Sequence, residues 1–577
     1  MAIVPRGFRD ILPDEAEMRE HVATTVRERL KQHGYRPIET PLIEASTVGV
    51  DGARPSDTPF KLFDDNGDLL IVKPDNTTAV VRAIATRMSE RDLPLRLRYE
   101  APVVRQQPRG TARRRQFTQL GYELVGEGGD AADAEMVLIA DEALAALGLE
   151  SWQLLCSSVA PYQALLELGA DAQLATEALG LVHANDYIDL DALIADSDLP
   201  APLKRAMCEL PRITGGAKAL DRVDALLRDA GATHSTTTEL RSLVQRLAIR
   251  DAAICSRLSF DFSLMNSFGY YTGLVLKAYA GDLADPVGSG GRYDAVLDTA
   301  LEQGAAAAGF AFSLERLTEA LEAQADRAER AADNVDGVTA SAPLRIAVPK
   351  GSLKDDTITM LNAVGIDADG LRDPGRHLIV PTRDARGGAD GIGAVELVIV
   401  RAADAPAFVA GGGADCGICG RDSIIEADLD LLQLVELGYG TCRFIEAEPA
   451  GSAGAAERAY ARRGTLRVAT KYPRIATSWY KQRGVHAEVV ALHGNIELGP
   501  IVGMADRIVD ITATGTTLRE NDLVITGELM TCTARFFANP GRARLDPRVR
   551  ELARRLAAWR VEGTRDDDHR SEARSPA

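Results

Sequence analysis

The chain has 577 residues, 46% of them hydrophobic and 26% charged, which is typical of a globular protein of several domains at roughly 150 residues each. Its 66 Lys and Arg and 84 Asp and Glu residues give a formal net charge of −18, which argues against a general nucleic-acid binder. The first residues lack the apolar core of a signal peptide, and no apolar run approaches the ~20 residues of a membrane span. We therefore expect a cytoplasmic protein that binds neither nucleic acid nor membranes.

Cysteine usage indicates a reducing environment. The seven cysteines are scattered along the chain, which fits free thiols better than a disulfide framework. Cys416 and Cys419 have the CxxC spacing of zinc and redox sites, but a zinc site needs a second ligand pair, and Cys442 and Cys532 are each solitary in the sequence. We interpret Cys416 and Cys419 as small apolar side chains of a buried strand.

The first third of the chain alternates helix and strand patterns. Residues 14–33 predict a helix, because their apolar residues recur at helical spacing before a glycine. Within residues 96–127 a strand leads through a basic loop at 109–115 into a second strand. A basic loop of this kind is more often a solvated tip than a binding site.

Six ordered segments within residues 1–325 resemble the catalytic core of histidyl-tRNA synthetase and its relatives. The segments are GFRDILP, KPDNT, QFTQLGYELVG, FGYYTG, GSGGRYDAVL and GFAFSLERL. The resemblance implies an α+β domain on an antiparallel sheet of the class II aminoacyl-tRNA-synthetase type. Residues 160–250 have helical periodicity and no evident chemistry, so we expect a helical insertion there.

Departures from the synthetase pattern indicate binding without reaction. Asn266 stands where the family has an Arg before the YYTG segment, Gln106 and Gln107 replace the family's acid, and no anticodon-binding domain follows. The region therefore resembles the histidyl-tRNA-synthetase-like regulatory subunit of histidine biosynthesis. That resemblance implies a histidine pocket lined by Asp75, Thr77, Arg105, Gln119, Glu123, Tyr270 and Tyr271.

The composition changes at residues 326–342, where charged and small residues predict a linker. Residues 343–563 then interleave apolar runs with helix patterns, which predicts a mostly parallel α/β sheet with ligands in the loops after the carboxyl ends of its strands. The polar residues 564–577 predict a disordered tail.

Residues 505–522 contain a strand pattern ending at Asp510, followed by the small-residue turn Thr512 to Thr517 and a helix start. Accessible backbone N–H groups and hydroxyls suit such a turn to a phosphate, and Asp510 would face a sugar diol or a metal-bound phosphate. A structural linker is the alternative for this pattern taken alone.

The C-terminal segments resemble the short form of ATP phosphoribosyltransferase. The ordered matches are PKGSL, RAADAPAFV, DCGICGRDSI, ATKYPRIA, GNIELGPIVGMADRIVD and TGTTLREN. The resemblance implies two lobes of the periplasmic-binding-protein type. One lobe would hold residues 343–435 and 524–538, and the other residues 438–522.

The resemblance implies transfer of phosphoribosyl from 5-phosphoribosyl 1-diphosphate to N1 of ATP with release of diphosphate, the first step of histidine biosynthesis. Mg²⁺ would be bound mainly through the diphosphate, without dedicated protein ligands. The implied catalytic residues are Lys350, Lys471 and Glu497. The implied phosphoribosyl-diphosphate site comprises Asp510, Thr512, Ala513, Thr514, Gly515, Thr516 and Thr517, and the implied ATP site comprises Gly420, Arg421 and Asp422.

The two resemblances together imply a fusion of a regulatory and a catalytic subunit, with histidine as an inhibitor and a homo-oligomeric assembly. Two alternatives stay open at the level of sequence. The C-terminal part could be a two-lobed binding module without turnover, which diphosphate release would exclude. The N-terminal part could retain aminoacylation, which histidine-dependent exchange of diphosphate into ATP would reveal.

Overall fold

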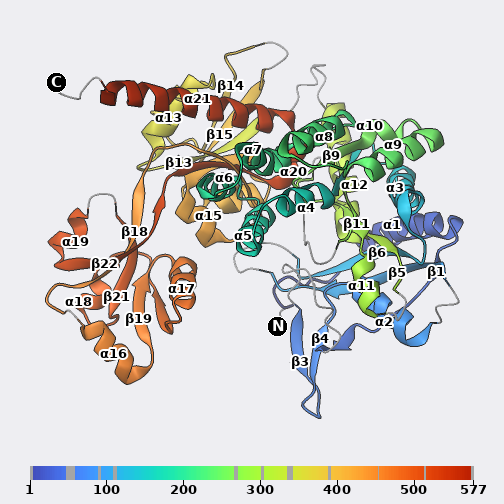
Figure 1. The fold of residues 1–577 in the computed structure, drawn as a ribbon, viewed down its shortest axis with the longest axis horizontal. Coiled ribbons are helices and arrows are strands. Elements are labelled where there is room, and N and C mark those ends of the chain that lie inside the picture. The colour runs from blue at the N-terminus through green and yellow to red at the C-terminus, as the bar shows by residue number, and fades with distance from the viewer. Residues whose placement is uncertain are drawn as a thin grey trace. The chain divides into compact units, whose positions relative to one another are not determined.

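The computed structural model describes residues 4–46, 59–88, 93–107, 114–264, 271–281, 283–300, 304–333, 342–387, 391–452, 454–512 and 515–572. The chain divides into two compact units, Met1–Thr339 and Ala340–Ala577 (Figure 1). This division falls within the predicted linker, but helix α12 (Leu314–Asp333) continues through its first part. The predicted start of the linker at residue 326 is therefore wrong, because the Ala, Glu and Arg residues there favour a continued helix.

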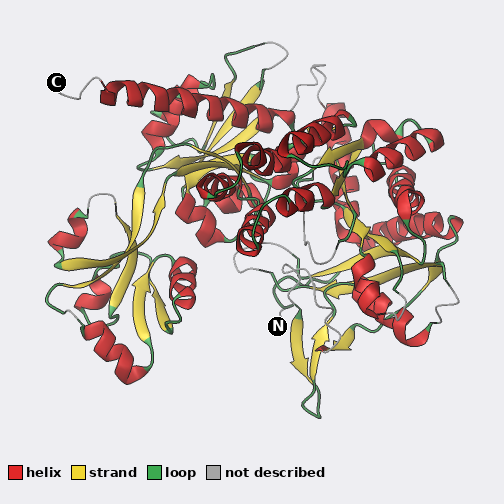
Figure 2. Cartoon of the chain, in the orientation of Figure 1, coloured by secondary structure: helices red, strands yellow, loops and turns green. Residues whose placement is uncertain are grey.

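A nine-stranded sheet forms the centre of the first unit (Figure 2). Its five central pairings, from β5 through β6, β12, β11 and β10 to β7, are antiparallel as predicted, and parallel pairs occur toward the edges at β1·β5 and β7·β9. The strands in spatial order are β1 (Arg36–Pro37), β5 (Leu95–Val104), β6 (Gln116–Val125), β12 (Ala307–Ser313), β11 (Gly288–Arg292), β10 (Leu274–Ala280), β7 (Trp152–Ser158), β9 (Leu258–Asp261) and β8 (Thr214–Gly215). A separate small sheet contains β2 (Ile43–Ala45), β4 (Leu69–Val72) and β3 (Phe60–Phe63).

Helices cover both faces of this sheet. On one face lie α1 (Pro13–Gln32), α3 (Gly129–Ala146) and α12, which contact one another or β6 and β12. On this side the Tyr122 hydroxyl of β6 donates to the Met136 carbonyl of α3. On the other face, α2 (Thr77–Arg87) and α11 (Asp294–Ala300) share an apolar core with Tyr99, Tyr271 and Tyr293. Because successive strand residues alternate faces, Gln119, Gly121 and Glu123 of β6 point to this second face.

Between β7 and β9 the chain is almost entirely helical, as expected for the insertion at 160–250. The helices are amphipathic; α8, for example, buries Leu220, Val223 and Leu227 at helical spacing. They are α4 (Ala160–Glu167), α5 (Ala172–His183), α6 (Tyr187–Asp196), α7 (Ala201–Glu209), α8 (Lys218–Ala230), α9 (Thr238–Arg250) and α10 (Ile254–Arg257).

The second unit contains two sheets, and both are mixed. The six-stranded sheet runs β14 (Ile379–Arg383), β15 (Ala394–Arg401), β13 (Leu344–Lys350), β16 (Cys416–Gly420), β23 (Ala534–Ala538) and β17 (Leu432–Glu436). The five-stranded sheet runs β20 (Ala487–Ala491), β19 (Leu466–Thr470), β21 (Arg507–Thr512), β18 (Cys442–Pro449) and β22 (Leu523–Cys532). Only β13·β15, β13·β16, β19·β20 and β19·β21 are parallel. The prediction of mostly parallel sheets is wrong, because the strands that cross between the sheets pair antiparallel.

Strand β22 corrects the predicted lobe boundary. Residues 524–532 were assigned to the first lobe, but they pair with β18 along its whole length in the five-stranded sheet. Figure 1 shows β18 and β22 as a long neighbouring pair. The chain enters the six-stranded sheet only at β23, because residues 523–532 already pair with β18.

Short helices connect these strands, and a long helix ends the described chain. The connecting helices are α13 (Lys354–Ala363), α14 (Ala405–Ala410), α15 (Arg421–Ala427), α16 (Ala455–Arg463), α17 (Pro473–Gln482), α18 (Leu498–Ile501), α19 (Thr516–Glu520) and α20 (Pro540–Leu545). Helix α21 (Pro547–Glu572) includes residues 564–572, so the predicted disordered tail is wrong over that range. Extending an existing helix costs far less than nucleating one. Within the described residues, no helix is long and apolar enough to cross a membrane.

Candidate functional site

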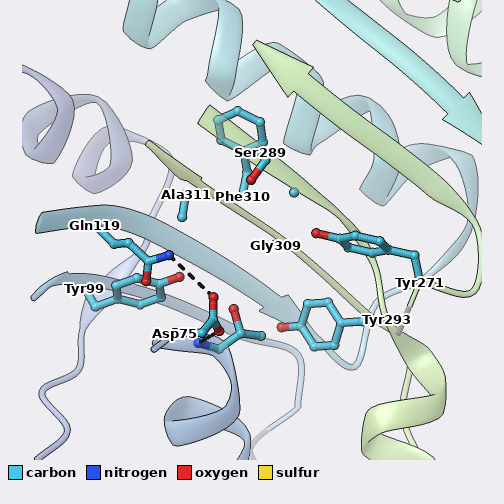
Figure 3. A pocket seen from close by; sticks show the side chains of 11 residues that line it. Asp75, Tyr99, Gln119, Tyr271, Ser289, Tyr293, Gly309, Phe310 and Ala311 are labelled. Atoms are coloured by element: carbon cyan, nitrogen blue, oxygen red, sulfur yellow. Dashed lines mark hydrogen bonds between the residues drawn. The ribbon is translucent and has the colours of Figure 1, made fainter. Parts of the chain in front are cut away.

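A small pocket lies on the second face of the nine-stranded sheet. Asp75 and Thr77, at the start of α2, border it on one side together with Gln119 of β6. Tyr271 and Tyr293, beside β10 and β11, face them from the opposite side (Figure 3). The remaining lining residues are Tyr99, Ser289, Gly290, Gly309, Phe310 and Ala311. The free volume is about 20 Å³, room for about one water, so an amino-acid-sized ligand requires the lining side chains to move apart.

Two glycines make room for the polar groups of this pocket. A Cβ on Gly121 would lie 2.3 Å from the Tyr99 ring, and a Cβ on Gly309 would lie 1.6 Å from Oε2 of Glu123. Any larger residue would therefore displace Tyr99 or the Glu123 carboxyl. The glycines of the QLGYE and GFAF segments thus serve close packing across neighbouring strands.

The Glu123 carboxyl lies behind the residues that line the pocket and is buried. It accepts hydrogen bonds from the hydroxyls of Thr77 (2.9 Å), Tyr99 (3.0 Å) and Tyr293 (2.6 Å). Burial raises the pKa of Glu123 to about 8, although these three hydroxyls oppose the shift and nearby Asp75 adds to it. Glu123 is therefore largely protonated at neutral pH, and it can release a proton when a cationic group approaches.

Glu123→Gln is expected to change how the stability of the first unit depends on pH. A folded pKa near 8, above the unfolded value of about 4.3, means that the folded state binds the extra proton. The contribution of this bound proton to the free energy of unfolding is complete below about pH 4 and falls by about 1.4 kcal/mol per pH unit as pH rises toward 8. Glutamine does not titrate, so the variant should lack this slope.

Hydrogen exchange of the β6 amides between pH 5.5 and 8, corrected for intrinsic rates, measures the slope. Glu150→Gln, at an exposed position of the same unit, serves as the matched control and should keep the wild-type slope. Equal slopes in wild type and Glu123→Gln would contradict the prediction.

The segment before α2 is held in place by backbone and side-chain hydrogen bonds. Asp75 accepts from the Thr77 N–H at 2.7 Å, and Oε1 of Gln119 accepts from the side chain of Asn76 at 2.8 Å. Gln119 also donates to Asp75 at 3.5 Å. Arg105 donates to the Pro74 carbonyl at 2.8 Å and lies 3.9 Å from the Asp75 carboxylate. Acceptors and donors for the amino and carboxylate groups of an amino acid thus lie at one edge of the pocket.

Six of the seven residues predicted for this pocket lie in the described chain, and the structure brings them together. Asp75, Thr77, Gln119 and Tyr271 line the pocket, Glu123 lies beneath it, and Arg105 contacts Asp75 from outside. Tyr270 lies outside the described residues, as does Asn266. Sequence reasoning missed Tyr99 and Tyr293. Tyr293 stands within the quoted GSGGRYDAVL segment, whereas only the β5·β6 register brings Tyr99 over Gly121.

In the second unit, the predicted site residues stand where strands end. Lys350 ends β13, Gly420 ends β16, Lys471 follows β19, and Thr512 ends β21. Lys350 and Lys471 are exposed. In both sheets these ends are the carboxyl ends, the usual position of ligand-binding loops in α/β folds.

Asp510 is the centre of one group of charges. Burial raises its pKa, while the Ile511 N–H and Lys471 oppose the shift and Glu497 adds to it. The Ile511 N–H donates to the Asp510 carboxylate at 2.9 Å. The structure therefore brings together Lys471, Glu497 and Asp510, which come from three different segments of the sequence.

In the described part of the turn after Asp510, one backbone N–H group is already bonded within the turn. Oγ1 of Thr512 accepts from the Gly515 N–H at 2.8 Å, and Gly515 has φ +71°, a conformation that favours glycine. Thr516 and Thr517 follow as exposed residues at the start of α19. Ala513 and Thr514 lie outside the described residues.

The predicted ATP segment, Gly420 to Asp422, contacts the five-stranded sheet through Tyr472. Burial raises the pKa of Asp422, and the Tyr472 hydroxyl beside it opposes the shift. Tyr472 packs edge-on against Phe444, with ring centroids 4.8 Å apart. Glu426 of α15 accepts from the first N–H groups of α17, at 3.1 Å for Arg474 and 3.2 Å for Ile475. These contacts join the two sheets of the unit.

Cys416 and Cys419 are free and buried in β16, as predicted. Burial raises the pKa of both thiols. Among the described residues, no group of three or more His, Cys, Asp or Glu side chains could hold a metal ion.

Comparison with known proteins gives two family matches along the chain. The family model of histidyl-tRNA synthetase matches residues 7–317, and that of ATP phosphoribosyltransferase matches residues 401–558. An ATP phosphoribosyltransferase of Rubrobacter xylanophilus is 44% identical over 220 residues, covering 38% of this chain and 96% of that protein. An ATP phosphoribosyltransferase regulatory subunit of Geobacillus thermodenitrificans is 32% identical over 319 residues, covering 55% of this chain and 80% of that protein.

A solved structure is similar to the larger part of the chain. It is an ATP phosphoribosyltransferase regulatory subunit/histidyl-tRNA synthetase from Bacillus halodurans C, with a TM-score of 0.51 and 26% sequence identity. The similarity covers 63% of this chain and 89% of that one. The match agrees with the α+β architecture of the first unit.

Proposed function

The chain belongs to the histidyl-tRNA synthetase family over residues 7–317 and to the ATP phosphoribosyltransferase family over its C-terminal part, and we propose that its first unit senses histidine and controls the transferase. The transferase catalyses the first step of histidine biosynthesis. The observation that carries the proposal is the presence, in one chain, of matches to most of a catalytic protein and most of a regulatory subunit.

The transferase joins C1 of the phosphoribosyl group to N1 of ATP, and diphosphate leaves. Bond breaking at an anomeric carbon develops positive charge on the sugar, as in glycoside hydrolysis. Catalysis therefore depends on holding two anionic substrates together and on stabilising the leaving diphosphate.

We assign roles in this reaction from the positions of the charged groups. Asp510 accepts hydrogen bonds from the ribose hydroxyls, and Lys471, whose charge acts on Asp510, neutralises phosphate. Lys350 does the same at the end of β13, and Glu497 orients the ribose. The turn from Thr512 to Thr517 holds the 5-phosphate with backbone N–H groups and hydroxyls, and Gly420, Arg421 and Asp422 contact ATP.

Mg²⁺ fits this arrangement as an ion carried by the substrate. Asp510 and Glu497 supply two nearby carboxylates, which suits an ion that keeps several waters and binds few protein groups. Bound to the diphosphate, it would neutralise the charge of the leaving group. The two-sheet unit is also compatible with the proposed two-lobed periplasmic-binding-protein type.

Histidine recognition is supported by the polar groups of the first pocket. Asp75 suits the ligand's amino group, Gln119 and Arg105 supply donors, and the buried Glu123 carboxyl holds the hydroxyls of three lining residues, Thr77, Tyr99 and Tyr293. Tyr271 and Tyr293 supply aromatic walls. Inhibition requires two global states with different histidine affinity, which a homo-oligomer of fused chains would provide.

Histidine is expected to lower the initial rate of diphosphate release by the full chain, measured with ATP and 5-phosphoribosyl 1-diphosphate. Asp75→Ala and Gln119→Ala should each raise the histidine concentration for half-inhibition at least about fivefold, because each removes a ligand partner of about 1–3 kcal/mol. Asp65→Ala, at an exposed position of the same unit, is the control. Full activity at saturating histidine would exclude regulation, and absence of diphosphate release would exclude the transferase.

A further inference from the structure

Cys442 and Cys532, solitary in the sequence, face each other in the structure. Cys442 begins β18 and Cys532 ends β22, and the two are directly paired across the antiparallel ladder. Opposite residues in such a ladder have Cβ atoms about 4.5–5.5 Å apart, and disulfides span Cα separations of about 4.4–6.8 Å. Because the two residues are directly opposite each other, their side chains leave the same face of the ladder. The backbone therefore already holds the two sulfurs within reach of a bond.

The two thiols differ in access and acidity. Cys442 is half-buried, whereas Cys532 is 1% exposed. The neighbouring Cys532 thiol lowers the pKa of Cys442, and Cys442 together with burial raises the pKa of Cys532. The thiolate is the reactive form, so Cys442 is suited to attack an oxidant and Cys532 to resolve the product. Cys416 and Cys419, by contrast, stand three residues apart on β16 and point to opposite faces.

The pair lies where the chain crosses between the two sheets of the second unit. One crossing, residues 437–441, precedes Cys442, and the other, Thr533, follows Cys532. The carbonyl of Thr533 accepts from the Arg421 N–H at 3.0 Å, and that of Thr531 accepts from the Arg421 guanidinium at 3.5 Å. The backbone on both sides of Cys532 therefore positions Arg421.

Electrostatic interactions also indicate that the two thiols lie near the proposed ATP segment. Asp422 raises the pKa of both thiols, and Cys442 contributes to the raised pKa of Tyr472. A change in the position or charge of the two sulfurs thus acts directly on the groups that surround Asp422.

We propose that Cys442 and Cys532 form a reversible disulfide, a redox modification site that controls the transferase through the Arg421 segment. A small-molecule disulfide is the oxidant. The Cys442 thiolate attacks one of its sulfurs, forming a mixed disulfide and releasing one thiolate. The Cys532 thiol then loses its proton and attacks the Cys442 sulfur, and the second small thiolate leaves and takes up that proton. Two protein thiols are oxidised and one small disulfide is reduced to two thiols.

Closing the bond sets the distance between the sulfurs at about 2.05 Å and their dihedral angle at about ±90°. The side chain of Cys532 is then fixed, which constrains the neighbouring Thr531 and Thr533, whose carbonyls contact Arg421. We expect oxidation to lower the activity at least fivefold, because misplacement of a substrate-positioning group by a fraction of an ångström is costly in catalysis. This activity effect rests on the proposed transferase function, whereas formation of the bond does not.

The full chain is treated with glutathione disulfide at pH 8, blocked with an alkylating agent and digested without reductant. Mass spectrometry should find a peptide pair linked through Cys442 and Cys532, and diphosphate release should fall at least fivefold and recover with dithiothreitol. Cys532→Ala should instead accumulate glutathione on Cys442. The double variant Cys442→Ala/Cys532→Ala should keep its activity after oxidation, and Cys255→Ser, at a half-buried cysteine of the first unit, should behave as wild type.

Two results would overturn the inference. If both thiols stay alkylatable in the oxidised protein, the disulfide does not form. If the linked peptide forms while the rate is unchanged, the site does not control the enzyme. If the linked peptide forms on oxidation but the reduced protein also releases no diphosphate, the transferase function is contradicted while the disulfide is still supported.

Discussion

Asp510→Asn is expected to lower kcat/KM for 5-phosphoribosyl 1-diphosphate by about 100-fold or more. The substitution keeps the shape of the side chain but removes its negative charge and one of its two acceptor oxygens. Losing one preorganised electrostatic interaction with the transition state typically costs about 10²–10³ in rate. Because burial raises the pKa of Asp510, the wild-type rate should also fall as acidic pH protonates this carboxyl, and the variant should lack that dependence.

Steady-state rates of diphosphate release between pH 5 and 8 measure both effects. The matched control is Asp522→Asn, in the same segment, because Asp522 is exposed and its φ of +52° suits asparagine. The control should retain activity within about twofold. Equal losses in the two variants would indicate that Asp510 acts through folding, and an unchanged Asp510→Asn would remove it from the site.

Arg555→Met is expected to destabilise the second unit by about 3–5 kcal/mol, the usual cost of breaking a buried ion pair from one side. Arg555 of α21 makes a two-bond contact with Asp384, at 3.0 and 2.9 Å, and both side chains are at most 3% exposed. Asp384 also accepts from the N–H groups of Ile392 and Arg386. Without the Arg555 guanidinium, the charged Asp384 carboxylate stays buried with only these two backbone N–H groups as partners.

Hydrogen exchange of the β15 amides reports the stability of this unit. The control is Arg554→Met, the next residue, whose ion pair with Glu551 is largely exposed and should contribute under 1 kcal/mol. Burial would raise the pKa of Asp384, but Arg555 and the two N–H groups hold it below its usual value. The difference in the free energy of unfolding between wild type and Arg555→Met should therefore be largest at neutral pH and shrink as pH falls below about 4. Equal protection in the two Arg variants would contradict the prediction.

The local elements were predictable because their signals are local. The helix expected at residues 14–33 is α1 (Pro13–Gln32), which buries Val22, Val26 and Leu30. Loops near Lys350, Gly420 and Thr512 were also expected, because glycines or small residues follow apolar runs there. Strand β21, however, continues two residues beyond the predicted strand end at Asp510, to Thr512. The limits of the linker and of the tail were not, because both depend on how far a helix that is already packed continues.

Strand pairing lay beyond the reach of the sequence. The pattern of residues 523–532 predicts a strand but does not indicate which sheet it joins. Only the ladder to β18 assigns these residues to the five-stranded sheet. The same ladder brings Cys442 and Cys532 together, although nothing near either cysteine indicates a partner. Tyr99 likewise enters the pocket only because β5 is registered against Gly121 of β6.

The sequence by itself determined the two families, their order in the chain and part of the lining of the first pocket, because ordered motifs carry that information directly. Only the tertiary structure decided which groups act on one another. The burial of Glu123, the grouping of Asp510 with Lys471 and Glu497, and the facing thiols all arise between segments far apart in the chain. Register and burial are properties of the folded sheets, and a linear pattern records neither of them.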